Sequence, residues 1–211
     1  MSLADIDAVA HHPDGPAHGA VVLTHGAGGS RESPLLIGIC EQWAQRGWLA
    51  VRYNLPYRRR RPKGPPSGSA AADLSGVAEA IAQAAALTSG PVIAGGHSYG
   101  GRLTSMVAAD RPDRLSALTL FSYPLHPPGK PERLRTGHFP AITVPTVFTH
   151  GSSDPFGSVP ELRAAVAFIP APTAIVEISG ARHDLRATTG SKVLDVPAAA
   201  VDAVLQIGSW G

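Results

Sequence analysis

The sequence contains one cysteine, Cys40, and no uninterrupted apolar run that approaches ~18 residues, the length that spans a bilayer. A lone cysteine excludes an intramolecular disulfide and argues against a cysteine-rich metal site. Cys40 lies in the apolar stretch 35–43, so we expect it to be a buried packing residue. No charged start leads into an apolar secretory segment. We therefore predict a cytoplasmic protein with no membrane contact.

The sequence also has little excess charge of either sign, with a formal net charge of +2. The positive charge is local: one run holds five cations and no acid, namely Arg58, Arg59, Arg60, Arg61 and Lys63. Outside that run, 13 Lys and Arg stand against 16 Asp and Glu. A charge confined to one loop disfavours general nucleic-acid binding. We expect no nucleic-acid partner and look to this loop for substrate contacts.

The chain has no internal repeat and no linker that would separate two domains. Its 211 residues, 44% of them hydrophobic, are enough to bury one sizeable core. A second large domain would not fit in this length. The prediction is a single domain that spans residues 1–211.

Short apolar runs typical of buried strands alternate with amphipathic segments typical of helices. Strands are expected at 19–24, 48–53, 91–95, 115–121, 144–149 and 173–178, with a weaker edge strand at 4–9. Helices are expected at 34–46, 69–87, 101–109, 159–168 and 197–207, while the proline-rich stretch 54–68 is expected to be irregular. This alternation predicts an α/β fold: a doubly wound, mostly parallel, twisted sheet with helices on both faces.

Residues 96–100 read Gly-His-Ser-Tyr-Gly and stand between an expected strand and an expected helix. This order is typical of a nucleophile elbow, which exposes a serine hydroxyl on a sharp turn. The flanking glycines lack Cβ atoms and allow strand and helix to approach closely. We therefore predict Ser98 to be a nucleophile.

A serine hydroxyl needs a base to take its proton, and the base needs a carboxylate to orient it. His183 follows the last expected strand, and Asp154 follows the strand before it. The carboxyl ends of parallel strands meet at one edge of a sheet. Asp184 is a rival to Asp154, but a residue adjacent to His183 usually points its side chain elsewhere. The predicted catalytic residues are Ser98, Asp154 and His183.

Negative charge that develops on a substrate carbonyl needs hydrogen-bond donors already in place. Tyr99 follows Ser98 at the start of a helix, where backbone N–H groups are free. Ala27 lies in a glycine-rich turn directly after the strand at 19–24. We predict that the backbone N–H groups of Ala27 and Tyr99 form an oxyanion hole.

Further polar residues near the same edge are candidates for substrate binding: His25, His97, Arg58 and Arg59. A metal role for His25 and His150 is disfavoured because they show no compact ligand spacing. The glycine-rich turn at 26–29 lacks the lysine and spacing of a phosphate-binding loop. The sequence therefore predicts neither a metal nor a cofactor.

These residues together resemble the α/β-hydrolase superfamily over nearly the whole chain. A narrower likeness, to the small, lidless dienelactone-hydrolase-like group that includes relatives of the testis-expressed hydrolase-like proteins, is carried by residues 53–58, 95–102 and 122–127. The resemblance implies a minimal α/β-hydrolase fold without a large lid. It also implies a catalytic triad of Ser98, Asp154 and His183. Dienelactone hydrolases commonly use a cysteine where this sequence has Ser98.

The expected function is hydrolysis of a small carboxylic ester or thioester through an acyl-Ser98 intermediate, in a monomer or homodimer. The run at 58–61 suggests a preference for anionic substrates. Two alternatives stay open. One is a peptidase or other amide hydrolase with the same triad, and the other is a noncatalytic interaction module that engages a partner through the basic run or the segment 122–141.

Overall fold

The computed structural model describes residues 3–186 and 195–208. Its strands form one seven-stranded sheet of short strands, in which β2 to β6 are mostly buried and the edge strands β1 and β7 are mostly half-buried. The strands are β1 (Ala8–His11), β2 (Ala20–Thr24), β3 (Leu49–Tyr53), β4 (Val92–His97), β5 (Ala117–Phe121), β6 (Thr146–Gly151) and β7 (Thr173–Ile178). The helices are α1 (Pro34–Gln45), α2 (Pro56–Arg60), α3 (Ala71–Ala86), α4 (Tyr99–Asp110), α5 (Val159–Val166) and α6 (Val196–Ile207), with two short 3₁₀ turns at Pro112–Arg114 and Phe139–Ala141.

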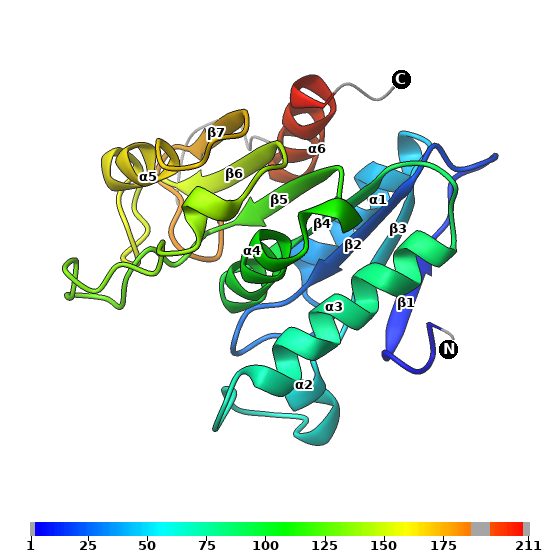
Figure 1. The fold of residues 1–211 in the computed structure, drawn as a ribbon, viewed down its shortest axis with the longest axis horizontal. Helices are drawn as coiled ribbons and strands as arrows, with labels where there is room; N and C mark the ends of the chain where they lie inside the picture. Colours follow the sequence, from blue (N-terminus) through cyan, green and yellow to red (C-terminus); the bar gives the residue numbers. More distant parts are fainter. Residues whose placement is uncertain (1–2, 187–194, 209–211) are drawn as a thin grey trace.

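The sheet order is β1-β3-β2-β4-β5-β6-β7, and β2 to β7 run parallel. Only the edge strand β1 is antiparallel, paired with β3. Since parallel strands end at the same edge, the turns after β2, β4, β6 and β7 are neighbours (Figure 1). The predicted doubly wound α/β class is confirmed. The weak edge strand expected at 4–9 exists but is displaced to Ala8–His11.

Helices cover both faces of the sheet and bury two separate apolar cores (Figure 1). On one face, α3, α4 and α5 contribute Val77, Leu103 and Leu162. On the other, α1 and α6 contribute residues such as Val204 and Cys40, whose burial raises the pKa of its thiol to about 12. Cys40 is therefore the packing residue that the sequence predicted. No helix in residues 3–186 and 195–208 is long and apolar enough to cross a membrane.

The proline-rich basic stretch was expected to be irregular, but it contains the short helix α2. Pro56 occupies the first helical turn, where its fixed φ suits a helix and its missing N–H is not needed. The N–H of Tyr57 donates to the carboxylate of Asp73 on α3 at 2.9 Å. A tertiary contact therefore fixes a helix that local composition disfavours. Residues 1–2, 187–194 and 209–211 lie outside the described part, so the single domain over residues 1–211 stays a prediction.

The connection at 122–141 is more buried than its polar composition suggested. Tyr123, Leu125 and Phe139 all lie in the core. The rings of Tyr123 and Phe139 pack edge to face with centroids 5.2 Å apart, and both contact Phe148 of β6. Aromatic pairs of this kind add to the free energy gained from buried area. The segment therefore packs against the sheet beside the carboxyl end of β5.

Candidate active site

Ser98 stands on a strained turn between β4 and α4. Its φ of 52° and ψ of −114° are unusual for a residue with a side chain. A Cβ atom on Gly96 would lie 2.6 Å from the carbonyl oxygen of Thr24, and one on Gly100 would lie 2.5 Å from that of His25. Larger residues at either position would push the turn away from β2. The strand, turn and helix around Ser98 thus have the arrangement of a nucleophile elbow.

Two short hydrogen bonds join Ser98, His183 and Asp154, which come from three separate strand ends. The distance from His183 Nε2 to Ser98 Oγ is 2.7 Å, and that from His183 Nδ1 to Asp154 Oδ2 is also 2.7 Å. The carboxylate can only accept, so Nδ1 carries the proton and Nε2 faces the hydroxyl as an acceptor. The rival Asp184 instead accepts from the backbone N–H of Arg186 at 3.1 Å. The structure therefore places Asp154, and not Asp184, on His183.

The surroundings of Asp154 and His183 restrict both side chains. The second carboxylate oxygen of Asp154, Oδ1, accepts from the backbone N–H of Phe156 at 2.9 Å. The ring of Phe156 lies against the imidazole of His183 with centroids 4.2 Å apart. The side chain of Asp154 is fully buried, whereas that of His183 is 22% exposed. Solvent therefore reaches His183 and does not reach the carboxylate.

His97 lies inside the elbow and contacts the loop that carries His183. Its Nε2 donates to the backbone carbonyl oxygen of His183 at 2.7 Å. Burial lowers the pKa of His97, so the neutral form with a proton on Nε2 is favoured. The bond fixes the backbone at His183, which is a positioning contact, and a substrate contact of His97 stays a prediction.

The backbone N–H groups of Ala27 and Tyr99 are free to meet a ligand. Tyr99 is the first residue of α4, where an N–H has no acceptor within the helix. Ala27 lies in the turn after β2, which is closed by a bond from the N–H of Gly29 to the carbonyl of Gly26 at 3.0 Å. Among residues 3–186 and 195–208, no acceptor takes a hydrogen bond from either N–H. Both are suited to an oxyanion.

Two residues that sequence reasoning missed, Tyr57 and Asp73, lie behind these two positions. The hydroxyl of Tyr57 donates to the carbonyl of Ala27 at 2.7 Å and approaches that of Gly26 at 3.2 Å. Asp73, which is 3% exposed, accepts from the hydroxyl of Tyr99 at 3.0 Å. Its other oxygen accepts from the N–H of Tyr57. One buried carboxylate thus connects the backbone of Tyr57 to the side chain of Tyr99, behind both predicted oxyanion donors.

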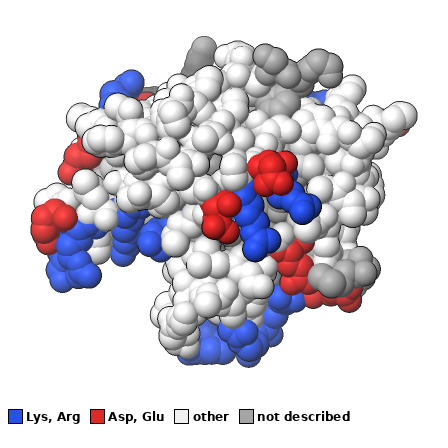
Figure 2. Space-filling model, viewed as in Figure 1, with Lys and Arg blue, Asp and Glu red and all other residues white. Residues whose placement is uncertain are grey.

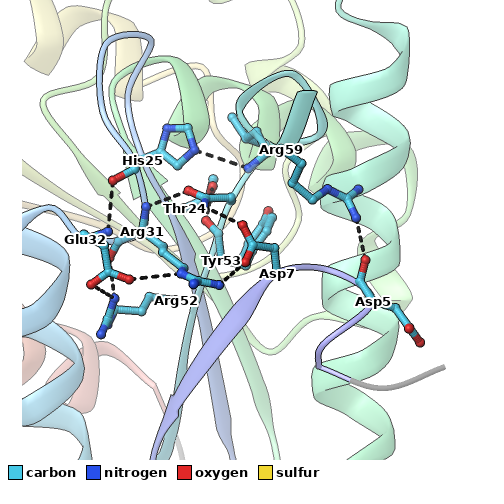
Figure 3. Close-up of polar contacts among 12 residues, drawn as sticks. Asp5, Asp7, Thr24, His25, Arg31, Glu32, Arg52, Tyr53 and Arg59 are labelled. Carbon is cyan, nitrogen blue, oxygen red and sulfur yellow. Dashed lines mark hydrogen bonds and ion pairs between the residues drawn. The ribbon is translucent and has the colours of Figure 1, made fainter. Parts of the chain in front are cut away.

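His25 is 1% exposed, and backbone groups occupy both of its ring nitrogens, one of which has its bond drawn in Figure 3. Nε2 accepts from the N–H of Leu55 at 3.2 Å, and Nδ1 donates to the carbonyl of Gly26 at 2.8 Å. Burial lowers the pKa of His25 to about 4, so the ring is neutral at neutral pH. These bonds give His25 a role in holding its turn, and its substrate contact stays a prediction.

Arg58 is 5% exposed, although its neighbours in the basic run are exposed. Its guanidinium donates to three backbone carbonyls, those of Gly29 at 2.7 Å, Arg61 at 3.0 Å and Gly64 at 2.9 Å. Arg59 donates to the backbone carbonyl of Asp5, as Figure 3 shows. Backbone carbonyls therefore occupy both arginines that were predicted to bind substrate.

A polar network ties the loop after β2 to the loop after β3 (Figure 3). The N–H of Arg31 donates to the side chain of Asn54 at 2.8 Å, and the guanidinium of Arg31 pairs with Asp7. Arg52 on β3 pairs with Glu32 at 2.9 Å. These bonds hold the loop that continues from the turn at 26–29.

Within residues 3–186 and 195–208, no group of three or more His, Cys, Asp or Glu is arranged to hold a metal ion. His150 is fully buried, and its Nε2 donates to the carbonyl of Gly157 at 2.8 Å. His150 Nε2 also lies 3.9 Å from Asp154 Oδ2, whereas His25 is bonded within its own turn.

The model of one protein family, described as "Alpha/beta hydrolase domain", matches residues 17–206. Among solved structures, TT1662 from Thermus thermophilus is similar with a TM-score of 0.75 and 20% identity, over 100% of this chain and 95% of that one. Est1E from Butyrivibrio proteoclasticus with bound ferulic acid has a TM-score of 0.72 and 17% identity, over 95% and 94% of the two chains. A dienelactone hydrolase from Anabaena variabilis has a TM-score of 0.68 and 20% identity, over 95% and 89%.

Proposed function

Because the chain belongs to the alpha/beta hydrolase domain family, we propose that it is a serine hydrolase that cleaves a small carboxylic ester or thioester through an acyl-Ser98 intermediate. The observation that carries the proposal is the pair of 2.7 Å hydrogen bonds that connects Ser98 Oγ to His183 and His183 to Asp154. These are the contacts that a serine needs in order to lose its proton during attack.

In the acylation step, Ser98 Oγ forms a bond to the substrate carbonyl carbon while its proton moves to His183 Nε2. The carbonyl oxygen becomes an oxyanion and accepts from the N–H groups of Ala27 and Tyr99. When the tetrahedral intermediate collapses, the bond to the leaving oxygen or sulfur breaks, and His183 returns the proton to that atom. Acyl-Ser98 and a free alcohol or thiol result.

Deacylation repeats these steps with water. His183 takes a proton from water as the water oxygen attacks the acyl carbon, and then returns a proton to Ser98 Oγ as the ester bond breaks. Asp154 stays ionised and stabilises the imidazolium of His183 in both halves. Its burial and its bond from the N–H of Phe156 hold the carboxylate in one orientation.

An ester or thioester is favoured over a peptide because the neighbours with named activities or ligands include a dienelactone hydrolase and an Est1E structure with bound ferulic acid. A noncatalytic module would need no bonded Ser98, His183 and Asp154. The short contacts among these three side chains therefore favour the enzyme over the interaction module.

A fluorophosphonate probe, which forms a covalent adduct with an activated serine, tests the proposal directly. We expect one adduct on the folded protein and none on Ser98→Ala. Ser75→Ala, a change at an exposed serine of α3, is the matched control and should label like the unaltered protein. Absence of an adduct, with a reference serine hydrolase labelled in the same experiment, would contradict the proposal.

A further inference from the structure

Arg102 lies on α4 four residues after Ser98, and nothing in the proposed reaction uses it. Its N–H donates to the carbonyl of Ser98 at 2.9 Å, so it belongs to the first full turn of the helix. Helical side chains lean toward the N-terminus of their helix. The guanidinium of Arg102 therefore leans toward the sheet edge where Ser98 stands. Residues four apart on a helix have Cβ atoms only about 5–6 Å apart.

Arg102 is partly buried, and its guanidinium makes no hydrogen bond to residues 3–186 or 195–208. Its Nε is inaccessible to solvent and has no hydrogen-bond partner among these residues. No carboxylate among residues 3–186 and 195–208 forms an ion pair with it. The nearby buried carboxylate of Asp73 is already used by Tyr57 and Tyr99. No acceptor among the described residues therefore occupies this guanidinium, so a ligand that binds it has no protein group to displace.

Arg135 comes from the connection after β5, and its backbone is fixed at both polar groups. Its N–H donates to the carbonyl of Leu125 at 2.7 Å, and its carbonyl accepts from the hydroxyl of Tyr123 at 2.7 Å. Its side chain is partly buried and, within the part of the chain that the structure describes, bonds to nothing. The backbone of Arg135 is therefore fixed beside Tyr123, and its guanidinium keeps its donors free for a ligand.

His138 and Ser105 dock this connection onto α4. Ser105 Oγ donates to the carbonyl of Arg102 at 2.8 Å and lies 2.8 Å from His138 Nε2, from which it accepts. Burial, and then the charge of Arg102, lower the pKa of His138 to about 4. Burial and the same guanidinium also lower the pKa of Arg135. The two arginines are therefore close enough to repel each other, and His138 between the elements stays neutral.

We propose that Arg102 and Arg135 form a binding site for an oxyanion, a carboxylate or a phosphate, carried by the substrate that Ser98 attacks. The proposal rests on the proposed function and names its substrate class: an ester or thioester with a negatively charged group on its acyl or alcohol part. Planar guanidinium groups match both oxyanions through paired N–H donors. A bound anion would accept from N–H groups of the two guanidiniums other than the buried Nε of Arg102 and offset the repulsion between the two cations.

The position of this cluster differs from that of the basic run at 58–61. In Figure 2, Lys and Arg side chains lie on the loop after β5 and on the loop after β3, with a hollow between them. On the β3 side, the buried Arg58 is occupied by three carbonyls. On the β5 side, Arg135 keeps its donors free. The structure therefore favours the β5 side as the place where a substrate anion binds.

Two esters with acyl chains of equal length test the proposal: the para-nitrophenyl monoester of adipic acid and para-nitrophenyl hexanoate. We expect a higher kcat/KM for the anionic ester after correction for spontaneous hydrolysis. Arg102→Gln and Arg135→Gln should each reduce this preference by about tenfold or more, since each removes a charge-assisted hydrogen bond. Arg102→Lys keeps the positive charge but lacks the paired donors, so it should lose part of the preference for the anionic ester. Arg133→Gln, at an exposed arginine in the same connection, is the matched control and should keep both rates.

Anion binding without turnover separates this proposal from the proposed function. Adipate and inorganic phosphate should raise the Tm of the protein, because a ligand that binds only the folded state stabilises it. The shift should vanish in Arg102→Gln and Arg135→Gln and persist in Arg133→Gln, and the more effective anion identifies the substrate group. An equal preference for the anionic ester in all variants, or no Tm shift with either anion, overturns the anion site even if Ser98 is active.

Failure to hydrolyse either ester, together with no fluorophosphonate adduct, overturns the proposed function. In that case the Tm shifts alone decide whether the anion site exists.

Discussion

The hydroxyl of Tyr57 offers a specific test of how the predicted oxyanion donors are held. It donates to the carbonyl of Ala27 at 2.7 Å. The N–H of the same residue is expected to donate to the substrate oxyanion. Tyr57→Phe removes this donor and keeps the ring, which packs edge to face against Tyr99 with centroids 6.1 Å apart. The substitution therefore releases the turn at 26–29 without opening a large cavity.

The expected effect on stability follows from one lost hydrogen bond at a partly buried site. Such a bond contributes about 1 kcal/mol net, and an acceptor left unpaired costs about 1–3 kcal/mol. We expect the free energy of unfolding to fall by about 1–2 kcal/mol. Removing an oxyanion donor altogether costs about 10²–10³-fold in kcat. Tyr57→Phe keeps the N–H donor of Ala27 but positions it less well, so we expect kcat to fall by about tenfold. KM should be nearly unchanged because the oxyanion exists only in the transition state.

The assay combines urea unfolding with kcat and KM for para-nitrophenyl hexanoate. Thr146→Val is the matched control because Thr146 Oγ1 donates to the carbonyl of Val144 at 3.0 Å, at the opposite end of the sheet. It should lose similar stability and keep kcat. Equal losses of kcat in the two variants, or a higher KM with unchanged kcat in Tyr57→Phe, would refute a role for Tyr57 in holding the oxyanion turn.

Two further predictions follow from the site. Asp154→Asn should reduce kcat by about 10³–10⁴-fold in the ester assay because His183 loses the charge that fixes its tautomer, whereas Asp184→Asn should keep near-normal kcat; comparable losses in both would contradict the assignment. The pKa of His25 falls from 6.5 to about 4 on folding, so the unfolded state binds more protons between these values and stability is lost as pH falls through that range. His25 alone should contribute about 2 kcal/mol to the stability lost between pH 7 and pH 5, so urea unfolding of His25→Gln should show a loss smaller by about that amount, and identical pH slopes in the two proteins would exclude a contribution from His25.

The positions of Ser98, Asp154 and His183 could be predicted because each follows an apolar run that reads as a strand. Once the strands are parallel, their carboxyl ends must lie along one edge, and three distant residues become neighbours. The structure places the three side chains within hydrogen-bond distance. The periodicity of strands and helices was thus enough to locate these residues, since their placement depends mainly on the topology of the sheet.

Other residues could not be predicted because their partners are set by side-chain packing. Asp73 reads as a charged residue in the first turn of an alanine-rich helix, and no local pattern indicates that it faces Tyr57 and Tyr99. The composition of the basic run likewise indicates solvent-exposed charge, whereas the fold buries Arg58 against carbonyl groups. Hydrogen bonds formed across 16 to 29 residues of sequence decided both cases.

The proline-rich basic stretch, which contains α2, holds the turn that follows β2. The N–H of Leu55 donates to the ring of His25, the hydroxyl of Tyr57 to the carbonyl of Ala27, and Arg58 to the carbonyl of Gly29. Alternate residues of the turn after β2 are therefore held by one short segment. Oxyanion stabilisation requires donors that are fixed before the reaction, because reorganisation during the reaction would cost free energy. The turn is glycine-rich and has little rigidity of its own, so its precision as a predicted oxyanion site must come from α2.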